Sequence, residues 1–355
     1  MDFEWNRFES IIKRYRQKVS PLAFENISRL KHQLFEDIGI SPEDYKEATL
    51  YHDISEDTHN SVFCQGLDEI TDSNITEIVN LKALKKYAYD RFTPTKKSLV
   101  HGNHLIFRNS LIRYIRYLEE NGVDYNGYKK HEVRYYRKNG IGRRYALGPS
   151  MQFMGREVRK VAFENISFDI DMVNACWSIL FSEIRDEHIA YKYPLISMYA
   201  SNPLIWKMIM SEYYDETIEE SKIRLLQPLY GLLPSDDNPF LWKINLEVIN
   251  AAKYLLSLEK NKIFRTMFQY RKIPIFSRLV TMILIKEDAL LSKLETMLLN
   301  EFPDANISLL QYDGLQLFAG QELKQDLENV LENFQYVTGV TVIIKELLPN
   351  QLKTT

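Results

Sequence analysis

The segment SFDIDMV, residues 167–173, contains two aspartates in a run that is otherwise suited to burial. If the segment is extended, its side chains alternate between two faces, so Asp169 and Asp171 project to the same side of one strand. This pattern constrains the fold more than the composition does. It also raises the question of why a buried strand ends in two negative charges.

A second candidate carboxylate lies in ANISLLQYDGLQLF at 305–318, which predicts a hairpin with Asp-Gly between two apolar strands. If this hairpin and the strand at 167–173 are neighbours in one sheet, Asp313 joins Asp169 and Asp171 at a sheet edge. Clustered carboxylates repel one another, and a hard divalent cation such as Mg²⁺ removes that repulsion. Two such ions can activate an attacking hydroxyl and stabilise a leaving oxygen.

Two structural interpretations compete with this metal site. Asp313 can serve the Asp-Gly turn alone, because this dipeptide is common in hairpin turns. Asp169 and Asp171 can instead flank an edge strand, where charges prevent pairing with other chains. The residues themselves leave these alternatives open.

The rest of the chain predicts a mixture of helices and strands. Helical spacing of apolar residues predicts helices at 3–19, 74–92, 104–122 and through most of 186–270, and a further strand pair is predicted at 336–348. Residues 126–160 are rich in Lys, Arg, Gly and Tyr, and we interpret them as a solvated loop or a phosphate-facing track. This order of elements predicts an α+β fold.

Composition sets wider limits. The 355 residues allow one large domain or roughly two to three packed subdomains. The formal net charge of -3 gives no bulk basic charge, although charge can still be segregated by face. Cys64 and Cys176 are too few for a disulfide framework, which predicts a reducing, intracellular compartment. The charged N-terminus is unlike a signal peptide, and no apolar run approaches the roughly 20 residues that span a membrane.

Five stretches resemble, in the family's order, segments of the polymerase module of family A DNA polymerases. The first is GRRYALGPSMQFM at 142–154. Gly142, Arg143, Pro149 and Gln152 fall without a gap on the family's positions for these residue types. The family uses that arginine and that glutamine against the primer–template.

Two further stretches resemble motifs A and B of the family. DMVNACWSIL at 171–180 is similar to motif A, in which a strand ends in a metal-binding aspartate, and Asp171 falls on that position. KIRLLQPLYG at 222–231 resembles motif B on the fingers helix. There Lys222 and Tyr230 have the family's spacing, and a glycine follows the tyrosine.

The remaining stretches resemble motif C and the segment before it. LLQYDGLQLF at 309–318 is similar to the motif C hairpin, and Asp313 falls on its catalytic aspartate. RKIPI at 271–275 resembles the preceding family segment through Arg271 and Pro274. Together the stretches cover residues 142–318.

The resemblance implies a right-hand polymerase with an antiparallel-sheet palm, helical fingers and a helical N-terminal thumb-like region. Its implied activity is that of a template-dependent nucleotidyltransferase, with a DNA-directed DNA polymerase as the leading interpretation and no proofreading exonuclease. Small size and divergence suggest a viral or mobile-element replication system. The implied domains are a thumb-like region at 1–140, the first part of the palm at 141–185, the fingers at 186–270 and the second part of the palm at 271–355.

The resemblance also implies roles for individual residues. Asp171 and Asp313, with the carbonyl of Met172, would hold two Mg²⁺ ions across the reacting phosphate. Lys222 would lie over the β- and γ-phosphates of the incoming nucleotide, and Tyr230 would stack near its base or sense its sugar. The competing interpretations are an exposed helix lysine and a core tyrosine.

Other implied contacts concern the primer–template and the nucleotide pocket. Arg143, Gln152 and Arg271 would contact primer or template, whereas a loop arginine and a surface amide are the structural alternatives. Cys176 and Leu226 fall on positions of the nucleotide pocket. Replication proteins are possible further partners.

The chain departs from the family pattern at several positions. Ile218 replaces an arginine before the motif B lysine, and Leu226 replaces an aromatic residue after it. Gly314 replaces the glutamate of motif C, and Asp169 has no family counterpart. Cys176 replaces the glutamate that excludes ribonucleotides, and the related phage-type RNA polymerases carry a small residue there. Two alternatives therefore stay open: an RNA polymerase or primase-like synthase, and a non-catalytic palm that binds nucleic acid as a replication accessory.

Overall fold

The chain folds into two compact units. The computed structural model describes residues 5–15, 71–90, 104–137, 142–232, 239–266 and 275–345. The first unit contains Met1–Ser61 and Asn174–Leu284, and the second contains Val62–Val173 and Ile285–Thr355. The described residues form helices in both units and antiparallel strand pairs in the second, which confirms the predicted α+β class. The thumb, palm and fingers boundaries stay a prediction.

Helices dominate the described part of the first unit, which agrees with the prediction for the described portions of 3–19 and 186–270. Its helices are α1 (Trp5–Tyr15), α8 (Ala175–Asp186), α9 (Pro194–Ser201), α10 (Pro203–Tyr214), α11 (Ile218–Leu226), α12 (Pro239–Ser257), α13 (Lys262–Thr266) and the start of α14 (Ile275–Glu301), with short 3-10 helices η5 (Ala190–Lys192), η6 (Gln227–Tyr230) and η7 (Glu259–Asn261). Aromatic rings join α1, α10 and α12. Trp206 stacks on Phe240 with ring centroids 5.0 Å apart, and Phe8 packs edge-on against Tyr213 at 5.5 Å.

A buried carboxylate on α12 caps the start of α9. Glu247 is 5% exposed and accepts hydrogen bonds from the backbone N–H groups of Leu195 (2.9 Å) and Ile196 (3.1 Å). N–H groups in the first turn of a helix have no acceptor within the helix, so Glu247 satisfies both. Burial nevertheless raises the pKa of Glu247 to about 8, although the two hydrogen bonds lower it.

We expect the free energy of unfolding of Glu247→Gln to rise relative to that of the intact protein as the pH increases from 5 to 8. The folded-state pKa of about 8 lies above the ordinary value of 4.5, so between these values the folded chain binds the extra proton. The intact protein therefore loses stability with rising pH in this window, by up to about 1.4 kcal/mol for each pH unit. Glutamine keeps an acceptor for the two N–H groups and does not titrate. Urea unfolding of the intact protein and of Glu247→Gln at pH 5 and 8 measures the effect. The same difference in unfolding free energy at both pH values would contradict the prediction.

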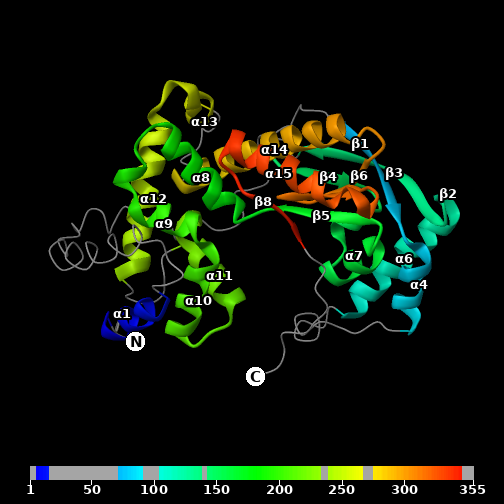
Figure 1. Ribbon diagram of the computed structural model, residues 1–355, viewed down its shortest axis with the longest axis horizontal. Coiled ribbons are helices and arrows are strands. Elements are labelled where there is room, and N and C mark those ends of the chain that lie inside the picture. The colour runs from blue at the N-terminus through cyan, green and yellow to red at the C-terminus, as the bar shows by residue number, and fades with distance from the viewer. Residues whose placement is uncertain are drawn as a thin grey trace. The chain divides into compact units, whose positions relative to one another are not determined.

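Within its described residues, the second unit contains two four-stranded antiparallel sheets. Their strands are labelled in Figure 1. The first has the order β1-β3-β2, with β4 also paired to β3, and the second has the order β6-β7-β5-β8. The strands are β1 (Thr71–Val79), β2 (Val123–Tyr125), β3 (Tyr128–Arg137), β4 (Arg144–Leu147), β5 (Ser167–Met172), β6 (Asn306–Leu310), β7 (Gly314–Phe318) and β8 (Val342–Lys345). The helices are α4 (Leu81–Asp90), α6 (His104–Asn121), α7 (Arg156–Phe163), α15 (Lys324–Thr338), the 3-10 helices η4 (Met151–Phe153) and η8 (Gln321–Leu323), and the later part of α14.

Helices α4, α6 and α7 lie beside the first sheet and enclose a hydrophobic core (Figure 1). Leu309 of β6 belongs to the same cluster, so this core also reaches the second sheet. The buried members of the cluster are Val79, Leu84, Ala88, Leu111, Tyr114, Ile115, Leu118, Met151, Val158, Ala162, Phe163, Ile166 and Leu309.

The first sheet corrects two expectations. Residues 74–92 do not form one helix, because β1 occupies the first part and only α4 is helical. The basic segment at 126–160 is not a continuous loop, because it contains all of β3 and all of β4. In β3 buried residues such as Val133 and Tyr135 alternate with exposed Glu132 and Arg134. The charged residues therefore lie on one face of the strand. They made the alternation of apolar and polar residues, which has a period of two, hard to recognise in the sequence.

Other expectations are confirmed or corrected in the second unit. The helix at 104–122, the strand at 167–173 and the hairpin at 305–318 are all present. The strand pair expected at 336–348 is wrong in its first half. That half is the end of α15, which stops where Gly339 adopts φ +70°, and the described residues beyond it hold the single strand β8.

Candidate active site

The predicted carboxylates meet on the second sheet. β5 lies between β7 and β8, and its register places Asp171 opposite Gly314. The N–H of Met172 donates to the carbonyl of Asp313 at 2.9 Å, so the hairpin tip is joined to the end of β5. Because β5 is paired on both sides, the edge-strand interpretation of Asp169 and Asp171 is wrong.

The sheet separates apolar and acidic side chains by face. Phe168, Ile170 and Met172 are at most 4% exposed, whereas Asp169 and Asp171 alternate with them and are partly exposed. This is the alternation that the sequence predicts for an extended strand. It leaves the two aspartates together on the polar face of β5.

The electrostatic environment of Asp171 is unusual for a carboxylate. Its pKa is raised to about 6, first by burial and then by the negative charge of Asp313, while Lys345 acts in the opposite direction. The Lys345 ammonium lies 2.6 Å from Oδ2 of Asp171, and the Asp171 side chain is only 14% exposed. Asp169 is held separately, because its Oδ1 accepts from the amide of Gln311 at 3.0 Å. The hairpin and β5 therefore form a cluster of interacting acids with one lysine in contact.

Gly314 explains one departure from the family pattern. It has no positive φ, so the turn does not require it for that reason. A Cβ atom at this position would lie 2.3 Å from the carbonyl oxygen of Ile170 and 3.0 Å from Oδ1 of Asp171. The glycine therefore permits close approach of β7 to β5, whereas this contact does not test the interpretation of Asp313 as a turn residue alone.

We expect Gly314→Ala to destabilise the protein by about 1–3 kcal/mol, because the added methyl group meets backbone that cannot move aside cheaply. Urea unfolding measures this loss. Gly155→Ala is the matched control, since a Cβ there meets nothing within 4 Å. Equal stability of the two variants would contradict this account of the hairpin.

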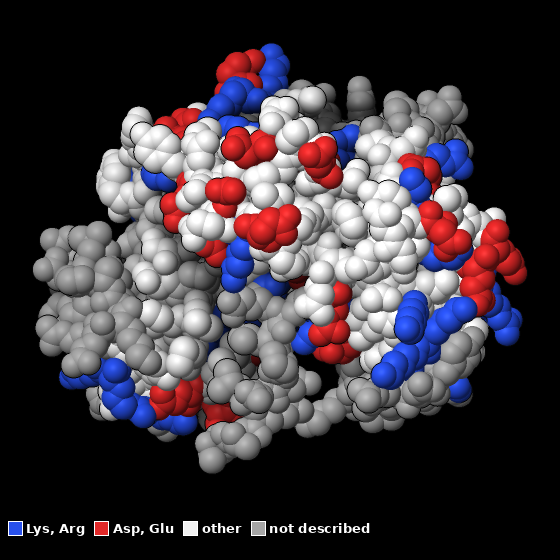
Figure 2. Space-filling model, turned by 45° about the vertical axis from the view of Figure 1, so that its right-hand side comes forward, with Lys and Arg blue, Asp and Glu red and all other residues white. Residues whose placement is uncertain are grey.

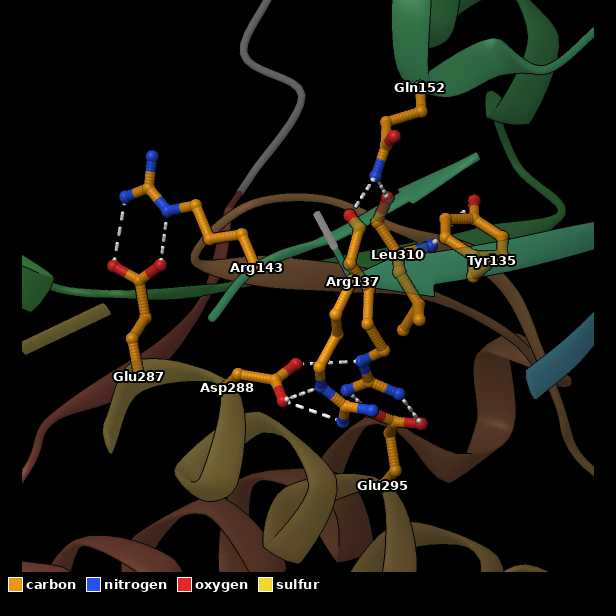
Figure 3. Close-up of polar contacts among 9 residues, drawn as sticks. Tyr135, Arg137, Arg143, Gln152, Glu287, Asp288, Glu295 and Leu310 are labelled. Atoms are coloured by element: carbon orange, nitrogen blue, oxygen red, sulfur yellow. Dashed lines mark hydrogen bonds and ion pairs between the residues drawn. The ribbon is translucent and has the colours of Figure 1, made fainter. Parts of the chain in front are cut away.

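Arg143 contacts the hairpin residue Tyr312 and is paired with Glu287, and Figure 3 shows the second of these contacts. Its Nε and Nη2 donate to the two carboxylate oxygens of Glu287 on α14 at 2.6 and 3.0 Å. Its guanidinium also lies over the ring of Tyr312, 5.1 Å from the centroid. Burial raises the pKa of Glu287, Arg143 lowers it, and the charge of Asp313 contributes to the rise, so this pair belongs to the same electrostatic neighbourhood.

Gln152 joins the two sheets of the second unit (Figure 3). Its amide nitrogen donates to the carbonyls of Leu310 (2.9 Å) and Arg144 (3.0 Å), and its oxygen accepts from the N–H of Ala146 at 2.8 Å. The residue is 6% exposed. These contacts support a structural role, and the predicted contact of Gln152 with nucleic acid stays a prediction.

A network of arginines and acids near the Arg143–Glu287 pair was not predicted from the sequence (Figure 3). Arg137 and Arg144 both donate to Asp288 on α14, each through Nε at 2.8 Å, and Arg144 also pairs with Glu295. The side chains of Arg144 and Asp288 are 5% and 8% exposed. A signal was available, since Asp288 and Glu295 are seven residues apart and so share a helix face. The network ties β3 and β4 to α14.

The predicted nucleotide-binding residues lie in the first unit. Lys222 is exposed on α11, Leu226 is its last residue, and Tyr230 is 44% exposed at the end of η6. The α-helix gives way to a 3-10 helix that contains Pro228, as expected from the missing N–H of proline. Cys176 is partly exposed in the first turn of α8. Arg271 lies outside the described residues.

A second lysine lies near Lys222. Burial lowers the pKa of Lys207 on α10, and the positive charge of Lys222 lowers it further. The two ammonium groups are therefore close enough to interact within this unit. The negative charge of Glu219 acts on Lys207 in the opposite direction, so this neighbourhood holds charges of both signs.

Charge over the visible face of the protein is mixed. Figure 2 shows acidic and basic side chains of the described residues interspersed over that face. Among the described residues no group of three or more His, Cys, Asp or Glu side chains is arranged to hold a metal ion. In the same parts of the chain, no helix has the length and apolar character needed to cross a membrane.

Comparisons with known proteins give a distant likeness in fold. No protein-family model and no curated protein sequence matches the chain. Among solved structures, the polymerase domain of Pol1 from M. smegmatis, in complex with DNA primer–template and dNTP, is similar with a TM-score of 0.38 and 12% sequence identity. The likeness covers 74% of this chain and 59% of that one, so the chain spans less than two thirds of its neighbour.

Proposed function

We propose that the protein is a template-dependent nucleotidyltransferase, and that it extends a nucleic-acid primer as a DNA-directed DNA polymerase. The single observation that carries this proposal is the meeting of Asp171 and Asp313 at the β5–hairpin junction. Burial and, after it, the negative charge of Asp313 raise the pKa of Asp171, and two acids that interact in a partly buried place are what a cation site requires. The order of the five family-like stretches supports the choice of reaction.

The donor set fits magnesium. Asp171 and Asp313 offer carboxylate oxygens, the ligands that hard divalent cations prefer, and Mg²⁺ commonly uses one or two carboxylates together with substrate phosphates. When bound, such ions would supply charge neutralisation at the reacting phosphate and the leaving pyrophosphate. The Met172 carbonyl is a further candidate ligand, as the family resemblance implies.

The remaining roles concern the chain's own groups. Lys222 would bind the nucleotide's phosphates, and Tyr230 would contact its base or sugar. Arg143, positioned by Glu287, would present its guanidinium edge to the primer or template near Asp313. Gln152 would act mainly by holding β4 and β6 together. Arg271 is proposed on the resemblance alone.

The experiment that tests the proposal is extension of a labelled DNA primer on a longer template, with dNTPs and Mg²⁺. We expect extension that stops at the template end and is abolished by EDTA. Lys222→Met should raise the KM for dNTP. Lys243→Met is the comparison, because Lys243 is a partly buried lysine on α12, and it should raise the KM less. Extension that does not follow the template sequence, or none at all with primer–template binding intact, would contradict the proposal.

Cys176 favours a second candidate function, an RNA polymerase or primase-like synthase. Its small side chain replaces the family's glutamate, which rejects the ribose 2′-hydroxyl. We expect Cys176→Glu to increase the preference for dNTPs over rNTPs in the extension assay, whichever sugar the intact protein prefers. An unchanged ratio of kcat/KM values would remove Cys176 from sugar selection.

The other alternative is a palm that binds nucleic acid without catalysis. Such a protein would bind primer–template with a strong salt dependence and little effect of Mg²⁺. Binding that is indifferent to Mg²⁺, together with no incorporation, would favour this alternative over the polymerase.

A further inference from the structure

Lys345 places a positive charge at the carboxylate where the proposed function needs a cation. It is the last residue of β8, opposite Asp169 in the strand register. Its ammonium nevertheless reaches the next aspartate along β5, with Nζ 2.6 Å from Oδ2 of Asp171. The Lys345 side chain is 30% exposed, so the pair is partly shielded from water.

The surrounding charges make this contact selective. Asp169 is occupied by the amide of Gln311, and Asp313 adds a second negative charge beside Asp171. Arg159 on α7 also interacts electrostatically with Asp169 and Asp171, but its Nη1 donates to the carbonyl of Met154 at 2.7 Å. Among the cations of the described residues, Lys345 is the one with an ion pair to Asp171.

We propose that Lys345 is an internal counter-ion that must release Asp171 before a divalent cation binds there. The inference rests on the proposed function, because that function makes Asp171 a cation ligand. A lysine suits this role, because its single ammonium lies on a flexible side chain and can leave the carboxylate. An arginine would hold the carboxylate through a bidentate contact. In the free protein Lys345 relieves the repulsion between Asp171 and Asp313, and it therefore weakens metal binding.

Binding of Mn²⁺ to the full chain, without nucleotide or nucleic acid, tests this competition directly. Electron paramagnetic resonance of the free ion gives the Kd independently of activity. We expect Lys345→Met to bind Mn²⁺ about ten- to a hundredfold more tightly than the intact protein, the range that corresponds to loss of one charged hydrogen bond. Lys345→Gln should behave similarly, which guards against a folding defect in one variant, and Lys345→Arg should not tighten binding.

Lys293→Met is the matched control, because Lys293 is an exposed lysine on α14 in the same unit, and its loss should leave the Kd unchanged. Equal or weaker Mn²⁺ binding by both Lys345→Met and Lys345→Gln would overturn the inference. If the intact protein extends primers in that case, the counter-ion role fails alone. If the intact protein neither extends primers nor binds Mn²⁺, and the variants do not bind it either, the proposed function fails with it.

Discussion

Asp313→Asn is expected to lower the rate of primer extension by at least about 10³-fold, the largest effect in this account. Asparagine preserves the size of the side chain but removes a negative charge next to Asp171. Burial is the larger cause of the raised pKa of Asp171 and the charge of Asp313 the second, so removal of that charge should lower this pKa in part. The loss should therefore fall on kcat, whereas primer–template affinity changes little.

The matched control for this variant is Asp304→Asn, an exposed aspartate just before β6. It should retain full activity. Circular dichroism and urea unfolding of both variants separate a chemical defect from a folding defect. Activity of Asp313→Asn within tenfold of the intact protein would remove Asp313 from catalysis.

Arg144→Met is expected to destabilise the protein by about 3–5 kcal/mol, the cost typical of removing one partner from a buried ion pair. Arg144 is 5% exposed at its side chain and pairs with both Asp288 and Glu295. Its loss leaves Glu295, 15% exposed, without this arginine, and leaves Asp288 with Arg137 alone. Equilibrium unfolding in urea measures the change.

Two further variants separate the contribution of Arg144 from those of its neighbours Arg137 and Glu295. Arg137→Met should cost much less, because Arg137 is 23% exposed and Asp288 keeps Arg144. Adding Glu295→Met to Arg144→Met should recover part of the loss, since it removes the uncompensated carboxylate. If Arg144→Met is no more harmful than Arg137→Met, the network does not hold α14 against β3 and β4.

The site could be predicted where local pattern determines structure. The alternation around Asp169 and Asp171 defines β5, and two apolar runs around Asp313 define the hairpin, so each element follows from its own residues. Their meeting was expected only on the condition that the two segments are neighbours in one sheet, which the family resemblance implies. The central position of β5 was not predictable, since strand order depends on pairing between distant segments.

Other features could not be predicted from the sequence, because the interacting residues are distant along the chain or because charged residues obscure the alternation of a strand. Lys345 lies in an apolar run, and only the register between β5 and β8 brings its ammonium to Asp171. Gly314 has the sequence of a turn glycine, but the constraint is its contact with Ile170 on another strand. Charged residues on the exposed face of β3 made a strand resemble a loop.

The central claim is that Asp171 and Asp313 act as one unit in nucleotide incorporation. Single-turnover extension rates of Asp171→Asn, Asp313→Asn and the double variant test it most directly. We expect each single variant to lose at least about 10³-fold and the double variant to be no more than about tenfold slower than the worse single variant, because residues acting together give non-additive losses. Either single variant with near-intact activity, or losses that multiply fully in the double variant, would contradict the claim.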